Sequence, residues 1–127
     1  MLLVACIFAG LAALLHVYIF VLESLRWEHP STRRAFGTTV ETAAITKPLA
    51  YNQGFYNLFL AIGLFAGIIL MPSSEDAAVA VLAFGMGSMV AAATVLITSD
   101  RTKARAALIQ GVLPALGLLC LLVWALA

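Results

Sequence analysis

Long uncharged stretches separated by short charged ones dominate this chain. Residues 1–22, 48–74, 77–99 and 106–127 contain no Asp, Glu, Lys or Arg. A helix needs roughly 20 apolar residues to cross the hydrocarbon core of a bilayer, and each stretch is long enough. The pattern predicts an all-α integral membrane protein. Because the connections are short, we expect an antiparallel four-helix transmembrane bundle. Its spans should cover about 2–23, 49–71, 77–98 and 105–126.

Composition agrees with a chain that lies almost entirely in the membrane. Hydrophobic residues make up 64% of it, charged residues 10%, and the mean hydropathy is +1.08. A soluble domain carries about 25% charged residues. We therefore expect one four-span domain over 1–127. The first stretch has no basic residue before it and ends at Glu23, not at a cleavage site, so we interpret it as a span and not as a signal peptide.

The basic residues predict the orientation, because all seven lie in two connections. Arg26, Arg33, Arg34 and Lys47 belong to the segment 26–47, and the others are Arg101, Lys103 and Arg105. Basic residues near span ends favour the cytoplasm, so both termini should lie on the non-cytoplasmic side. The net charge of +1 indicates no affinity for nucleic acid, and the expected partner is the lipid bilayer.

The connection before the second span should lie at the membrane interface. Residues 30–37 suit one or two helical turns that end at Gly37. Thr38 and Glu41 fit a capping box before another short turn. Pro48 suits the first turn of the second span, where its missing N–H costs nothing.

Small residues mark where the spans can approach closely. Association of helices in lipid relies on such contacts. Because small four-span proteins often assemble, we also expect a homo-oligomer. The residues are Gly63 and Gly67, which form a GxxxG pair, then Gly85, Gly87, Ser88 and Ala91 to Ala93, then Ala107, Gly111 and Ala115.

Polar residues of the spans gather in the half that the charges assign to the cytoplasm. His16 and Glu23 are seven residues apart, so an α-helix places them on one face. Pro114 leaves the carbonyl of Gln110 without its helical partner. These residues predict a ligand-binding site. Its candidates are His16, Glu23, Asn52, Gln53, Tyr56, Asn57 and Gln110.

Each of these residues also has a purely structural interpretation. Polar side chains in spans often form interhelical hydrogen bonds worth about 1 kcal/mol and nothing more. Glu23 could be solvated or paired with Arg26. His16 is harder to explain in this way, because ionisable groups inside a membrane are by default functional candidates.

Several kinds of site are not favoured. Cys6 and Cys120 show no metal-ligand spacing and suit apolar packing, so no metal site is expected. Haem ligation by His16 is not favoured, because a lone intramembrane histidine has no partner motif. The chain contains no GxGxxG, GxxxxGK[ST], HExxH or GxSxG motif.

The polar residues and their neighbours resemble one known family. The matching residues are the run from His16 to Glu23, Trp27, Phe36, the block from Asn52 to Ala61 with Gly63-Leu64, and Gln110 with Pro114. The family comprises small bacterial four-span membrane proteins known only as domain of unknown function thirteen-oh-four. The resemblance covers essentially the whole chain and implies a four-helix bundle in the bacterial inner (plasma) membrane, without an established activity. The third span departs from the Gly/Tyr-containing patch associated with the family, because it has Ser88 to Thr94 there.

Three functions fit these observations. The first is binding or transport of a small, partly lipophilic molecule at the polar site, since amides, a tyrosine and a carboxylate give directional hydrogen bonds. The second is a membrane-embedded enzyme, isomerase- or transferase-like, with the catalytic candidates His16, Glu23 and Tyr56. The third is a structural or partner subunit whose polar residues only fix helix packing. The cofactor is not predicted.

Overall fold

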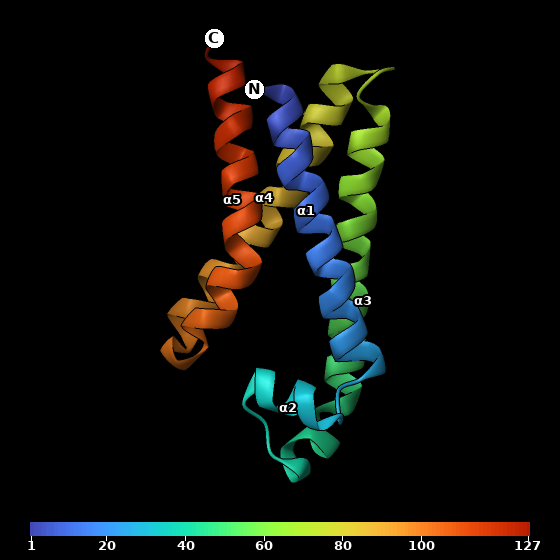
Figure 1. The fold of residues 1–127 in the computed structure, drawn as a ribbon, viewed down its shortest axis with the longest axis vertical. Coiled ribbons are helices and arrows are strands. Elements are labelled where there is room, and N and C mark those ends of the chain that lie inside the picture. The colour runs from blue at the N-terminus through green and yellow to red at the C-terminus, as the bar shows by residue number, and fades with distance from the viewer.

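The computed structural model describes residues 1–127 and is helical throughout. The elements are α1 (Leu2–Phe20), the π-helical turn η1 (Val21–Leu25), α2 (Pro30–Phe36), α3 (Val40–Leu70), α4 (Glu75–Ser99), the 3₁₀ turn η2 (Arg101–Lys103) and α5 (Ala104–Ala125). Four of the helical segments are long and apolar enough to span a membrane. Both termini lie at one end of the molecule, which we call the terminal end. α2 lies at the opposite end, which we call the loop end (Figure 1).

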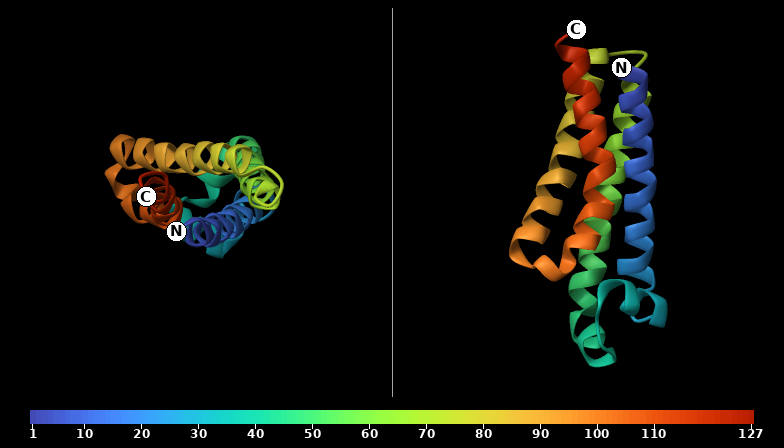
Figure 2. Two further views of the ribbon diagram at one scale, coloured as in Figure 1. Left: turned by 90° about the horizontal axis from the view of Figure 1, so that it is seen from above. Right: turned by 60° about the vertical axis from the view of Figure 1, so that its left-hand side comes forward.

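The four long helices form a ring in which each helix has two neighbours. α1 packs against α3 and α5, and α4 packs against the same two helices from the other side. α1 and α4 meet at few points across the ring. The view along the bundle shows this arrangement, with α4 and α1 on opposite sides (Figure 2).

The core joins a stripe of alanines on α1 to larger side chains from the other helices. Four fully buried alanines of α1 recur at helical spacing and therefore share one face. The partners that fill the space opposite them include Leu64, Leu82, Met86 and Met89. Small residues on one helix allow close approach of its neighbours, as expected for a bundle in lipid. The alanine residues are Ala5, Ala9, Ala12 and Ala13.

Glycines of α3 and α4 receive the large side chains of the facing helix. A Cβ atom on Gly67 would lie 2.8 Å from Leu82 Cδ2, and one on Gly85 would lie 2.7 Å from Leu64 Cδ2. In contrast, a Cβ atom on Gly63 would meet nothing within 4 Å. Within one copy of the protein, only Gly67 of the GxxxG pair therefore makes a close approach to another helix. Gly63 lies one turn from Gly67 on the same side of α3, where a groove separates α3 from α4.

The helix that contains the second span begins earlier than the sequence suggests. α3 starts at Val40, and the Thr39 side chain caps it by accepting a hydrogen bond from the Thr42 N–H at 3.2 Å. The predicted cap at Thr38 is thus wrong by one residue. Pro48 lies inside α3 and not in its first turn. Pro48 has no N–H to donate to the helix, and the turn before it is held by the contacts of Thr46 with Trp27 and of Lys47 with Glu28.

The segment 26–39 folds back on the start of α3 at the loop end. α2 ends at Gly37, whose φ of +66° is the left-handed conformation that glycine adopts freely, as predicted. The Trp27 ring packs edge-on against Phe36 at 5.1 Å, and its Nε1–H donates to Thr46 Oγ1 at 3.2 Å. Lys103 Nζ donates to the Phe36 carbonyl at 2.7 Å and so connects α2 to the α4–α5 hairpin.

The turn that positions Lys103 is capped by Asp100. The Asp100 carboxylate accepts hydrogen bonds from Thr102 Oγ1 at 2.6 Å and from the Thr102 N–H at 2.9 Å. These two bonds hold the pKa of Asp100 below its usual value, because they favour the charged carboxylate.

The two glycines of the GxxxG pair offer a matched test of the α3–α4 contact. Replacing either by Ala gives the helix the same gain in propensity. The Cβ atom at position 67 must displace the buried Leu82, whereas the one at position 63 meets open space. We expect Gly67→Ala to be less stable than Gly63→Ala by about 1–3 kcal/mol, the usual cost of overpacking. Equal unfolding free energies of the two variants in mixed detergent would contradict the packing described here.

Candidate functional site

A carboxylate and an amide meet between the end of the first helical segment and α3. Asn57 Nδ2 donates to Glu23 Oε2 at 2.8 Å. The same nitrogen donates to the backbone carbonyl of Gln53 at 3.2 Å. Asn57 is only 9% exposed, while Glu23 is half-buried. We define Glu23 and Asn57 as the carboxylate–amide pair.

A π-helical turn determines where Glu23 lies. η1 continues α1 but follows the wider i→i+5 hydrogen-bond pattern over Val21–Leu25, with Glu23 at its centre. Such turns are rare and frequently occur at functional sites. Because the turn is wider than an α-helical one, Glu23 is rotated from the direction that seven-residue spacing gives it. The prediction that His16 and Glu23 nearly coincide in direction assumed an unbroken α-helix.

Ser24 and Gly54 bring η1 close enough to α3 for this contact. Ser24 Oγ donates to the backbone carbonyl of Tyr51 at 2.7 Å. A Cβ atom on Gly54 would clash with Ser24 Oγ and lie 3.0 Å from the Ser24 backbone nitrogen. Glycine is therefore required at this position for the close approach. The sequence analysis did not identify Ser24 as a site residue, and only its position next to Glu23 could have indicated it.

His16 is buried but separate from the carboxylate–amide pair. It is 2% exposed, and its Nδ1 lies 2.8 Å from the Ala12 carbonyl oxygen of its own helix. Because a carbonyl only accepts, Nδ1 carries the proton in this bond and Nε2 is left as an acceptor when the ring is neutral. His16 forms no hydrogen bond with any other candidate residue.

None of the remaining candidates bonds to the pair through its side chain. Asn52 and Gln53 are exposed, and Gln53 contributes only its backbone carbonyl. Tyr56 is 58% exposed, and Gln110 is partly buried on α5. Their participation in a ligand site stays a prediction, whereas the contact of Glu23 with Asn57 is part of the fold.

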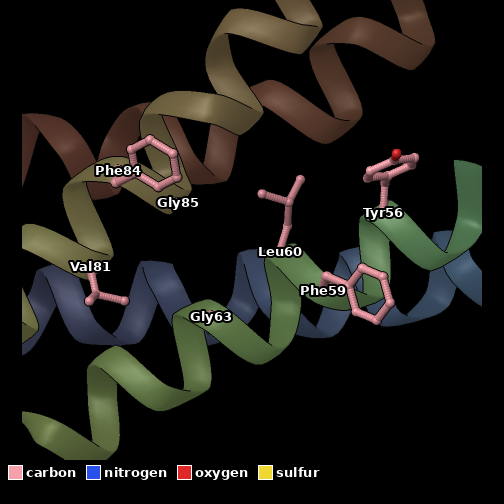
Figure 3. A pocket seen from close by; sticks show the side chains of 7 residues that line it. All are labelled: Tyr56, Phe59, Leu60, Gly63, Val81, Phe84 and Gly85. Carbon is pink, nitrogen blue, oxygen red and sulfur yellow. The ribbon is translucent and has the colours of Figure 1, made fainter.

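An apolar groove lies between α3 and α4, on the face of α3 next to the one that carries Asn57. Its volume is about 300 Å³. Tyr56, Phe59, Leu60 and Gly63 line it from α3, and Val81, Phe84 and Gly85 line it from α4 (Figure 3). The open space beside Gly63 belongs to this groove. A second hollow of about 420 Å³, lined by Ile97, Thr98, Arg101 and Ala104, lies at the loop end. Neither hollow is lined by Glu23 or Asn57.

No basic side chain of the protein neutralises Glu23. The one salt bridge of the structure joins Lys47 to Glu28 at the loop end, outside the site. The alternative that Glu23 pairs with Arg26 is therefore wrong. Likewise, no three residues of the His, Cys, Asp and Glu types gather as a metal site would require. A carboxylate in this position can accept hydrogen bonds or a proton from a molecule that enters the site.

The bond between Glu23 and Asn57 predicts energetic coupling of the two residues. Interhelical hydrogen bonds in membrane proteins contribute about 0.6–2 kcal/mol. In a double-mutant cycle of Glu23→Ala and Asn57→Ala, we expect a coupling energy of about 1 kcal/mol in the unfolding free energy. A parallel cycle of Glu23→Ala with Asn52→Ala should give no coupling, because Asn52 is exposed and unbonded. Coupling of similar size in both cycles would argue against a specific contact.

Comparison with known proteins identifies a family but no function. A family model described as Protein of unknown function (DUF1304) matches residues 10–122. No curated protein and no solved structure matches the chain. The match covers α1 beyond its first turns, the carboxylate–amide pair, the segment at the loop end and nearly all of α5. The chain therefore belongs to this family of unknown function, as the residues from His16 to Pro114 predicted.

Proposed function

We propose that this membrane protein binds or transports a small, partly lipophilic molecule at the carboxylate–amide pair. The observation that carries the proposal is the half-buried Glu23 carboxylate, which is held by Asn57 and has no basic partner. An unpaired ionisable group inside a membrane segment is costly and is usually retained for function. Structural packing alone would be served equally well by two amides.

The surroundings of the pair favour a ligand with an apolar part. Phe20 of α1 packs edge-on against Phe55 of α3 at 5.1 Å, one helical turn before Glu23. The groove beside Tyr56 and Leu60 opens on the adjoining face of α3. Binding sites commonly combine an apolar lining with a few polar groups that fix orientation.

We further propose the bacterial inner membrane as the location, with the four helices crossing it in alternating directions and both termini outside. In that orientation the carboxylate–amide pair lies in the cytoplasmic half of the bundle. Apart from Glu75 and Asp76 in the first turn of α4, the terminal halves of the helices carry no charged or amide side chains, so one copy offers no continuous polar path across the membrane. Transport would therefore need a pathway between copies in a homo-oligomer, and binding would not.

Ligand retention tests the proposed site. Protein purified in native lipid is analysed by mass spectrometry and absorption spectroscopy beside Glu23→Ala, Asn57→Ala and the control Glu41→Ala, which removes an exposed carboxylate outside the candidate residues. We expect a small molecule to remain with the wild type and the control, and its occupancy to fall at least tenfold in the other two. A tenfold loss corresponds to about 1.4 kcal/mol, within the range for a lost hydrogen bond to a charged group. Equal occupancy in all four proteins would place the ligand elsewhere.

Cysteine labelling tests the proposed orientation. Cys6 and Cys120 are first replaced by Ala, and a single Cys is then placed at the exposed Ser74 or Ser31. We expect a membrane-impermeant maleimide to react with the Cys at position 74 once the outer membrane alone is permeabilised. The Cys at position 31 should react only after the inner membrane is permeabilised, since it lies beside the basic residues. The reverse labelling pattern would show that the termini lie in the cytoplasm and would contradict the proposed orientation.

A further inference from the structure

The hydrogen-bonding capacity that the carboxylate–amide pair leaves unused consists of acceptors only. Asn57 Nδ2 has two hydrogens, and these are directed at Glu23 Oε2 and at the Gln53 carbonyl. The donors of the amide are thus fully engaged. Its Oδ1 and the second carboxylate oxygen, Glu23 Oε1, have no partner in the protein.

Both free acceptors can be reached from outside the protein. The fully enclosed side-chain oxygens without a partner are those of Thr32 and Thr38 only. Glu23 Oε1 and Asn57 Oδ1 are not enclosed, although Asn57 as a residue is buried. An entering group can therefore bond to these two oxygens without displacing a protein partner.

The charge at this position is uncompensated. All seven basic residues lie outside the contact range of Glu23, and Lys47 is engaged with Glu28. An ionised carboxylate away from water is strongly destabilised unless a positive charge or a proton neutralises it. A ligand that supplies both a positive charge and N–H donors satisfies this requirement and the two free acceptors together.

We infer that the ligand of the proposed site is an amphiphilic amine, bound as its ammonium form through Glu23 and Asn57 with its hydrocarbon part against apolar side chains. The inference rests on the proposed function. An anionic headgroup is excluded, because the pair would present oxygen acceptors to it and no donor. A metal ion such as Ca²⁺ needs six or more oxygen ligands, and the pair offers two. An alcohol would donate to one acceptor but leave the negative charge of Glu23 without a positive partner.

Three probes with the same chain and different headgroups test this inference. Octylammonium, octanol and octanoate are titrated by calorimetry into the full-length protein in phosphatidylcholine nanodiscs, with empty nanodiscs as the blank. We expect octylammonium to bind at least tenfold more tightly than octanol, and octanoate not to bind. Octanol or octanoate binding as tightly as the amine would overturn the amine class while leaving the proposed binding function intact. Absence of binding by all three would overturn both.

Charge variants locate the preference at Glu23. Glu23→Gln keeps an acceptor for Asn57 but removes the charge, so the affinity for octylammonium should fall to that for octanol, with octanol binding retained. Glu41→Gln, the same change at an exposed position of α3, should leave the preference unchanged. An amine preference that survives Glu23→Gln would overturn the inference.

Glu23→Asp decides the case if the Gln variant binds nothing. It keeps the carboxylate on a shorter side chain, so it should retain the preference for octylammonium over octanol at lower affinity. Loss of the preference in Glu23→Asp, with octanol still bound, would overturn the inference.

Discussion

Gly54 lets the end of the first helical segment approach α3 until the backbone of one meets the backbone of the other. The Ser24 hydroxyl bonds to the Tyr51 carbonyl across this contact, and one residue earlier Glu23 reaches Asn57. Without this approach, neither side chain has the reach to bond across the two helices. The candidate site therefore depends on the absence of a single methyl group, because any Cβ atom at position 54 would separate η1 from α3.

Much of the fold could be predicted from charge and hydropathy alone. Four uncharged stretches became four long helices, since a segment in lipid must satisfy its backbone groups internally. The α2 helix and its stop at Gly37 also followed from local signals. The start of α3 did not, because Pro48 is acceptable both in a first turn and a little further inside a helix. The helix begins at Val40, directly after the Thr39 cap, so the residues between this cap and Pro48 are also helical.

The candidate site was predictable only in part. Both members of the carboxylate–amide pair stood out as polar residues in apolar stretches, but Glu23 bonds to Asn57 from a π-helical turn that the sequence did not predict. No sequence pattern predicts such a turn, since it depends on how the end of α1 packs against α3. His16 attracted attention for the same reason as Glu23, yet its proton is used by its own helix. Polarity in a span identifies candidates, while the bonds already formed decide which donors and acceptors each of them has left for a ligand.

The core and the connections of the ring are distributed unevenly along the bundle. The apolar core runs from the terminal end to the middle of the helices, through Ala5, Leu82 and Met86. At the loop end, the Lys103 side chain connects the α4–α5 hairpin to α2. Its long and flexible aliphatic chain places the ammonium group at the Phe36 carbonyl. A tether of this kind adjusts its length by rotation about single bonds, whereas interlocked side chains in the core do not. The bundle is consequently stiff at the terminal end and compliant at the loop end, on the side where the carboxylate–amide pair lies.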